Sequence, residues 1–243
     1  LRDWSLPKQD DTGPMGNSIN IKLMNTHLHL LEAMTTYYQA TKDPVARERL
    51  IELIFIQSNS VVRKTIGACT DKYQLDWKPI HSPEFDRVSY GHDLENVWLL
   101  ISACEAVGIN NRLLFDLYRT LFDYSLKYGY DSTYGGFYES GPFGGKADKR
   151  SKVWWVQAEC LVSALDMYCL TGDIVYFDCF NRTLSWIMKR QIDWINGDWY
   201  SEISESGEPI GEKAGAWKSA YHNGRAIMKC IEFMEEIISG KIR

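Results

Sequence analysis

An internal repeat of two helices followed by a hairpin constrains this chain more than any other feature. Apolar residues recur at spacings of three and four in seven segments, which predicts helices at about 23–41, 44–66, 92–107, 110–128, 151–170, 173–190 and 219–238. The links after the first, third and fifth helices are short. Those after the second, fourth and sixth alternate like strands: "CTDKYQLDW", "GYDSTYGGFYESG" and "DWINGDWYSEISESG". We therefore expect an all-α fold with short β-hairpins between helix pairs.

The period of this repeat favours a ring of helices. Landmark residues at the starts of successive odd helices are separated by 65 residues from His27 to His92, 62 from His92 to Trp154 and 68 from Trp154 to His222. The common solenoid repeats are shorter, roughly 20 to 50 residues. A period near 65 suits helical hairpins in a toroid, with one helix of each pair inside and the other outside. Six hairpins need roughly six such periods, so a chain with fewer than four is expected to form an incomplete ring.

Composition and charge exclude several classes of protein. The 243 residues, 45% of them hydrophobic, suffice for one large core. The net charge is −5 and no run of Lys and Arg is present, so nucleic acid is not an expected partner. No window approaches roughly 18 consecutive apolar residues, which argues against a membrane span. The six cysteines lack zinc-ligand spacing and fall mostly in apolar helical patterns, which indicates buried thiols, no structural metal and a reducing compartment such as the cytoplasm.

Polar residues recur at the N-terminal ends of the odd helices, where every histidine except His81 is found. Four pairs of residues spaced by three or four share a helical face: Asn25 with His29, His92 with Glu95, Trp155 with Glu159, and His222 with Arg225. Taken singly, such a histidine is more often a cap or a core residue, and the Trp154–Trp155 pair is more often core. The recurrence in one register favours a shared pocket instead. An aromatic content of 13% is compatible with sugar rings stacking there.

Four segments resemble motifs of a known family. "MNTHLHLLEA" (24–33), "SYGHDLENVWLL" (89–100), "KVWWVQAECL" (152–161) and "WKSAYHNGRA" (217–226) resemble, in order and spacing, the N-acylglucosamine 2-epimerase superfamily. "SYGHD" and "YHNGR" are more similar to the forms in its cellobiose 2-epimerase branch. The resemblance implies an (α/α)6 barrel, of which this chain is the C-terminal part: a single domain over 1–243 that begins with a loop at 1–20. It also implies that neither a metal nor a redox cofactor is needed.

The resemblance further implies a reaction and its residues. The expected reaction inverts C2 of the reducing-end glucose of a β-1,4-linked disaccharide, from cellobiose to glucosyl-mannose, through a cis-enediolate. Two bases on opposite faces of C2 are required, and imidazoles suit this work because their ordinary pKa lies near neutrality. By resemblance these bases are His92 and His222, with His29 assisting ring opening. Substrate contacts are expected from Asn25, Glu95, Trp154, Trp155 and Trp217.

One arginine is interpreted differently, and other functions stay open. Arg225 is expected to pair with an acid rather than to stabilise the enediolate oxygen.

A glycoside hydrolase would use two carboxylates such as Glu95 and Glu159, although the recurring histidines argue against it. An N-acylglucosamine 2-epimerase or an aldose–ketose isomerase of the same superfamily would share the enediolate. The non-enzymatic alternative is an inactive sugar-binding fragment. The sequence predicts neither the preferred disaccharide nor an oligomeric state.

Overall fold

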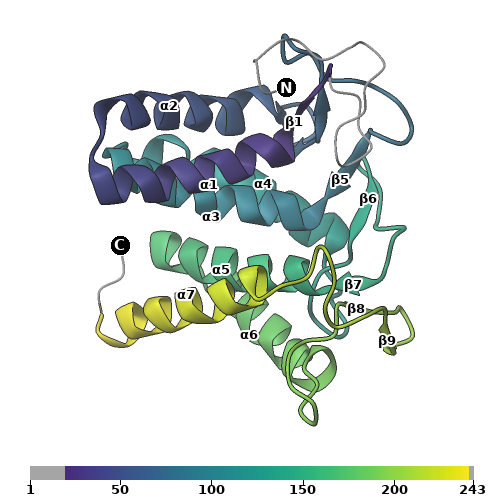
Figure 1. The fold of residues 1–243 in the computed structure, drawn as a ribbon. Coiled ribbons are helices and arrows are strands. Elements are labelled where there is room, and N and C mark those ends of the chain that lie inside the picture. Colours follow the sequence, from purple (N-terminus) through teal and green to yellow (C-terminus); the bar gives the residue numbers. More distant parts are fainter. Residues whose placement is uncertain (1–19, 241–243) are drawn as a thin grey trace.

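The computed structural model of the protein describes residues 20–240, so nearly all of the loop predicted at 1–20 lies outside the described residues. The prediction of an all-α fold is confirmed for this part of the chain (Figure 1). Two π-helical turns, Ile56–Ser60 and Ile187–Gln191, extend the second and sixth helices. The α-helices are α1 (Met24–Thr41), α2 (Pro44–Phe55), α3 (Tyr90–Val107), α4 (Phe115–Gly129), α5 (Trp154–Thr171), α6 (Ile174–Trp186) and α7 (Tyr221–Ile238).

Two predicted helices have different ends in the structure. The helix predicted at 44–66 ends earlier, because Val62–Arg63 pair with Ala68–Cys69 as strands β2 and β3. The helix predicted at 110–128 begins later, at Phe115, after a separate 3-10 turn at Asn111–Leu113. The Asn110 side chain caps that turn by accepting a hydrogen bond from the backbone N–H of Arg112. Both differences arise from local pairing or capping that apolar spacing does not encode.

The helices alternate between two layers. In the first layer α1 packs on α3, α3 on α5 and α5 on α7. The second layer consists of α2, α4 and α6, each of which packs on the odd-numbered helix before it. This is the arrangement of consecutive helical hairpins that the repeat predicts, and we call α1, α3, α5 and α7 the inner helices.

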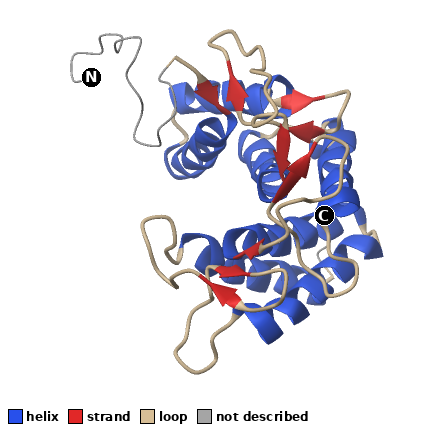
Figure 2. Ribbon diagram, turned by 90° about the vertical axis from the view of Figure 1, so that its right-hand side faces the viewer, coloured by secondary structure: helices blue, strands red, loops and turns tan. Residues whose placement is uncertain are grey.

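Short strands gather at one end of the layers (Figure 2). They form antiparallel pairs β1–β4, β2–β3 and β5–β6, and a three-stranded sheet β7–β8–β9. β1, β5 and β7 run directly into α1, α3 and α5, so the strands lie at the N-terminal ends of these inner helices. Besides β2 and β3, the strands are β1 (Lys22–Leu23), β4 (Lys72–Tyr73), β5 (Arg87–Ser89), β6 (Ser140–Pro142), β7 (Lys152–Val153), β8 (Glu202–Ile203) and β9 (Pro209–Ile210).

The core is centred on two of the inner helices. Of 18 residues in each helix, 14 are buried in α3 and 14 in α5, whereas 4 are buried in α1 and 3 in α7. The six cysteines are free thiols and five of them are buried, which confirms the prediction of buried thiols. Within residues 20–240, no helix combines the length and the apolar character that a membrane span requires.

Candidate active site

Four charged residues occupy equivalent positions on the four inner helices and meet at one point. Glu32, Glu95, Glu159 and Arg225 come from α1, α3, α5 and α7, and each follows a landmark of the sequence repeat by three or five residues. Nη2 of Arg225 lies 2.7 Å from Oε1 of Glu159 and 3.2 Å from Oε1 of Glu95. Nη1 of Arg225 pairs with Oε1 of Glu32. The interpretation of Arg225 as the partner of an acid is therefore confirmed. We call these four residues the charged cluster.

The pKa values of the three carboxyl groups of the charged cluster are shifted in different directions. Burial raises the pKa of Glu95 well above its ordinary range, and the neighbouring charge of Glu159 adds to the rise. Burial also opposes ionisation of Glu159, but a hydrogen bond from His222 and the charge of Arg225 lower its pKa overall. The pKa of Glu32 falls to about 2 despite its burial, through its contacts with His29, Arg225 and Tyr221. Near neutral pH, Glu32 and Glu159 are ionised, and both face the guanidinium of Arg225.

His222 is oriented by the carboxylate of Glu159. Its Nδ1 lies 2.6 Å from Oε1 of Glu159, while the indole Nε1 of Trp98 donates to Oε2 of the same carboxylate at 2.8 Å. Because the ionised carboxylate only accepts hydrogen bonds, Nδ1 of His222 carries a proton and donates it. Nε2 is then the nitrogen of His222 that is left for chemistry.

His92 and His222 share one aromatic neighbour. The ring of Trp155, at the start of α5, lies 4.8 Å from the ring of His92 and 5.7 Å from that of His222, measured between centroids. Trp154 contacts His222 edge-on, with 6.3 Å between centroids. Burial lowers the pKa of His92 to about 4, although the charge of Asp71 opposes that fall. His92 is therefore a neutral base near neutral pH.

A glycine allows α3 and α5 to approach closely at this point. A Cβ atom on Gly91 would lie 2.4 Å from Cζ3 of Trp155 and 2.9 Å from a methyl group of Val156. Both distances are far below van der Waals contact, so a larger residue fits only if the side chains of Trp155 and Val156 shift. This contact gives a physical reason for the glycine in the segment "SYGHD".

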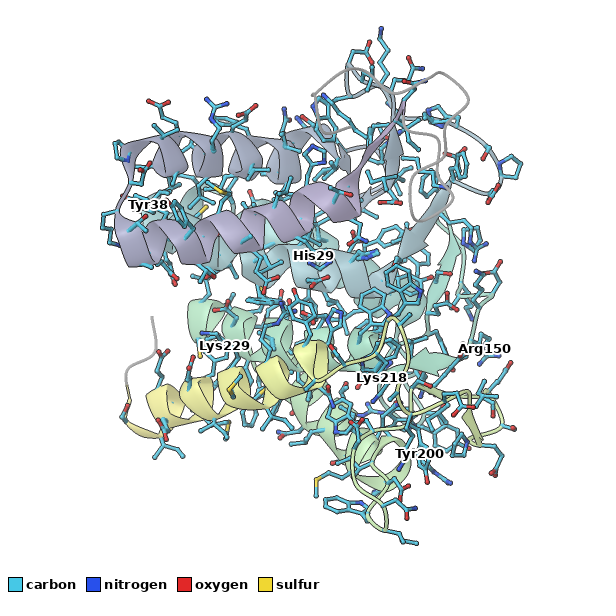
Figure 3. The ribbon with its side chains drawn as sticks, in the orientation of Figure 1. His29, Tyr38, Arg150, Tyr200, Lys218 and Lys229 are labelled. Carbon is cyan, nitrogen blue, oxygen red and sulfur yellow. The ribbon has the colours of Figure 1, made fainter. Side chains whose placement is uncertain are left out.

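His29 lies on the side of α1 that faces α7 (Figure 3). Its Nδ1 is 3.3 Å from the hydroxyl of Tyr221, and that hydroxyl also contacts Glu32 and accepts from Nη1 of Arg225 at 2.6 Å. His29 is thus joined to the charged cluster through Tyr221. By contrast, His27 is not joined to the charged cluster, and its Nδ1 lies 2.8 Å from the backbone oxygen of Leu23.

Two of the predicted substrate-binding residues lie apart from the charged cluster. The backbone N–H of Asn25 donates to Asp71, and its side-chain oxygen has no hydrogen-bond partner within residues 20–240. Trp217 is 72% exposed in the segment before α7, and none of the ring contacts in the described part of the chain involves it. The other predicted site residues are brought into one region: His29, His92, Glu95, Trp154, Trp155 and His222.

A cavity of about 460 Å³ opens beside His92 at the strand end of the layers. Trp155, Asp71, Arg87 and Lys149 contribute to its lining. Its volume lies in the range of roughly 300 to 1,000 Å³ that is usual for small-molecule sites. Of the sequence-predicted site residues, His92 and Trp155 line this cavity, so it offers one imidazole, a stacking surface and polar walls, while His222 lies on the other side of the Trp155 contact and outside the lining.

The region also contains donors that suit a metal ion. Glu95, Glu159 and His222 each bring one ligand atom to within 4.8 Å of the others. Nη2 of Arg225 contacts both of these glutamates, so a guanidinium supplies positive charge at this point.

Sequence reasoning missed three residues of the site. Glu32 follows His29 by three residues, the spacing of His92 to Glu95 and of His222 to Arg225, so the repeat register held a signal for it. Tyr221 immediately precedes His222 and gave no separate signal. Trp98 was hidden within an apolar helical pattern.

Comparison with known proteins supports the same family. The model of the family described as N-acylglucosamine 2-epimerase (GlcNAc 2-epimerase) matches residues 9–226. A cellobiose 2-epimerase of Bacteroides fragilis is 31% identical over 219 residues, which are 88% of this chain and 54% of that protein. A D-mannose isomerase of Marinomonas mediterranea is 27% identical over 225 residues, which cover 88% of this chain and 56% of that protein. The chain spans about half the length of the curated relatives it matches.

A solved structure agrees with these similarities. The cellobiose 2-epimerase of Spirochaeta thermophila superposes with a TM-score of 0.81 at 30% identity, over 97% of this chain and 58% of that one. The predicted fold class, an (α/α)6 barrel seen here in part, is confirmed. That this part is the C-terminal portion of the ring stays a prediction.

Proposed function

The chain belongs to the N-acylglucosamine 2-epimerase family, and from this premise we propose that the polypeptide carrying it inverts C2 of the reducing-end glucose of a β-1,4-linked disaccharide. One observation carries the proposal. His92 and His222, from different inner helices, contact the same indole ring of Trp155, so two proton-transfer groups border one stacking surface. The similarity to cellobiose 2-epimerases supports the choice of a disaccharide.

The two histidines would act in turn on opposite faces of C2. After the ring opens, one imidazole removes the C2 proton next to the aldehyde, and the electron pair moves onto the carbonyl oxygen to give a cis-enediolate. The other imidazole then returns a proton to the opposite face of C2. His92, neutral near pH 7 because burial lowers its pKa, suits the base role. His222 would act as the acid in its imidazolium form, with Nδ1–H donated to Glu159 and a second proton on Nε2. The roles exchange in the reverse direction.

Ring opening and substrate placement fall to the neighbouring residues. His29, hydrogen-bonded to the hydroxyl of Tyr221, would exchange protons with the ring oxygen and the C1 hydroxyl. Trp155 and Trp154, which lie beside the histidines, would stack on the reducing-end sugar ring, because the apolar faces of sugar rings pack on aromatic rings. Arg225 pairs with three glutamates. We therefore assign it the role of holding these acids in place, and not that of stabilising the enediolate oxygen. We also assign the protein to the cytoplasm, because its cysteines are free thiols.

A second candidate is an aldose–ketose isomerase, which the similarity to D-mannose isomerase favours. This reaction shares the enediolate and differs in the carbon to which the proton returns. Return to C2 gives the epimer, and return to C1 gives the ketose. Product analysis therefore separates the two activities.

The test is incubation of the polypeptide with cellobiose in D2O, followed by NMR of the products. We expect glucosyl-mannose with deuterium at C2, because an imidazole exchanges its proton with solvent. His92→Ala and His222→Ala should each lower the rate at least roughly 100-fold, as loss of an acid–base group does. His81→Ala is the matched control, since His81 lies outside the site and pairs with Asp86 on the surface.

Several results would contradict the proposal. Release of free glucose would indicate a hydrolase, and deuterium at C1 of a ketose would indicate the isomerase. Binding of cellobiose without turnover would indicate an inactive sugar-binding protein. Near-parent rates in either histidine variant would reject the pair of bases.

A further inference from the structure

A second cavity, of about 560 Å³, lies away from the catalytic histidines. Its walls come from the loop between α4 and α5, from the end of α6 with its π-helical turn, and from residues 203–207. None of the residues assigned above to the proposed reaction lines it. The ionisable side chains in its lining, apart from tyrosines, are four cations and two carboxylates: Arg150, Lys152, Lys189, Arg190, Asp131 and Glu205.

One wall of this cavity contains a buried cation, Lys152, which its partners hold in a fixed position. Lys152 is 5% exposed, and its Nζ lies 2.8 Å from Oδ2 of Asp131 and 2.6 Å from the backbone oxygen of Gly135. The same Nζ lies 4.5 Å from the ring centre of Trp186 and 5.4 Å from that of Tyr138. Because its charge is buried and has several partners, the side chain of Lys152 is a fixed part of the cavity wall.

The second cation of the wall is also paired. Nη1 of Arg150 lies 2.6 Å from Oε1 of Glu205, and Nη2 donates to the hydroxyl of Tyr138 at 3.0 Å. Both carboxylates of the cavity are therefore engaged by Lys152 and Arg150.

The other two cations are left without a counter-charge. Lys189 and Arg190 are exposed, and no carboxylate within residues 20–240 pairs with either of them. Arg190 extends its guanidinium over Gly207, which also lines the cavity. The lining thus carries two positive charges that no acid offsets, in a chain whose net charge is −5. Such a local excess concentrates anions at the cavity against the charge of the whole protein.

We propose that this cavity binds a small ligand bearing a phosphate monoester. A phosphate dianion matches the charge of Lys189 and Arg190, and a guanidinium recognises phosphate oxygens in a bidentate manner. The volume of about 560 Å³ leaves room for a sugar next to the phosphate. Tyr134, which is 74% exposed, and Tyr138 lie in the lining and provide aromatic surface for that sugar. The site is separate from the proposed epimerase reaction and does not depend on it.

The test is isothermal titration calorimetry of the polypeptide with two probes, inorganic phosphate and glucose 6-phosphate, at low ionic strength. We expect both to bind and the double substitution K189Q/R190Q to weaken each by roughly tenfold to a hundredfold, the loss of charge-assisted hydrogen bonds. Tighter binding of glucose 6-phosphate would support a sugar phosphate as the ligand, and binding no tighter than that of inorganic phosphate would overturn the monoester. Turnover of cellobiose should stay unchanged in the double variant.

Lys127→Gln is the matched control. Lys127, like Lys189 and Arg190, is an exposed cation in the last turn of a helix. A positive charge there interacts favourably with the helix dipole. It lies outside the cavity, so phosphate affinity should change less than twofold. The proposal is overturned if neither probe binds at millimolar concentration, if K189Q/R190Q binds like the parent, or if Lys127→Gln weakens binding as much as the double variant does. Thermal unfolding of each variant checks that the fold is intact.

Discussion

The two central inner helices and the two flanking ones reach the site by different physical means. α3 and α5 bury 14 of 18 residues each, so apolar packing sets the positions of His92 and Trp155. α1 and α7 bury 4 and 3, and they are joined to each other across the site by Glu32, Tyr221 and Arg225. The difference teaches that half of the site depends on the core and the other half on the charged cluster.

Removing the arginine should have the largest effect on this contrast. Arg225→Met leaves Glu95 and Glu159 buried without their counter-charge, so unfolding free energy should fall by about 3 to 5 kcal/mol. Lys229→Met, one turn further along α7, removes an exposed pair with Glu232 and should cost less than about 1 kcal/mol. Urea denaturation measures both. Equal losses would mean that the charged cluster does not hold α7.

A pair of glycines compares the central and flanking helices directly. Gly91→Ala in α3 forces a methyl group against Trp155 and should destabilise the protein by roughly 1 to 3 kcal/mol. Gly224→Ala in α7 meets its nearest neighbour at 3.6 Å and should stabilise by about 0.5 to 1 kcal/mol, through helix propensity. Thermal unfolding with a turnover assay checks both, and Gly91→Ala should also lower turnover. The same sign for both variants would show that α3 is not tightly packed against α5 here.

Acid should weaken the tie between α1 and α7. The pKa of Glu32 is about 2 in the folded protein and 4.5 in its ordinary state, so its contribution is complete above pH 4.5 and is lost as pH falls toward 2. Between pH 5 and 2 the parent should therefore lose about 1 to 2 kcal/mol of unfolding free energy through Glu32, after partial screening by solvent, and Glu32→Gln should not show this loss. Glu52→Gln is the control, because Glu52 forms an exposed ion pair with Arg49. Unfolding curves between pH 5 and 2, in steps of about half a unit, decide whether the two variants differ.

The smallest effect is expected on the open face of α7. Ile231 is 55% exposed, so Ile231→Ala should change the free energy of unfolding by less than about 0.5 kcal/mol. Leu165→Ala, at a fully buried position of α5, should cost about 2 to 5 kcal/mol. A loss near that size at Ile231 would mean that another segment or another copy covers α7 in solution.

The repeat made the helices predictable, because apolar spacing is a local property of the chain. It also placed His92, Glu95, His222 and Arg225 on shared helical faces, since residues three apart on a helix are neighbours. The contact between His222 and Glu159 joins two helices, and its atoms depend on how α5 and α7 are rotated, which no spacing within one helix contains.

Segments outside the helices were harder to predict. Trp217 was expected to stack on sugar through resemblance alone, and the structure places it 72% exposed in a segment without regular periodicity. Its part in substrate binding stays a prediction. Trp98 looked like a core residue because its neighbours are apolar, yet its indole N–H is the second support of Glu159.

The charged cluster has a consequence for the order in which the repeats assemble. Similar helical hairpins present nearly interchangeable apolar faces, so a chain made of them risks docking a module beside the wrong neighbour. Of the four inner helices in residues 20–240, three carry an acid at the equivalent position, and α7 carries Arg225, which distinguishes it from the others. A wrongly ordered array would gather acids without a counter-charge, at a cost of several kcal/mol. Within the described residues, one unlike side chain thereby favours the observed order of four otherwise similar helices.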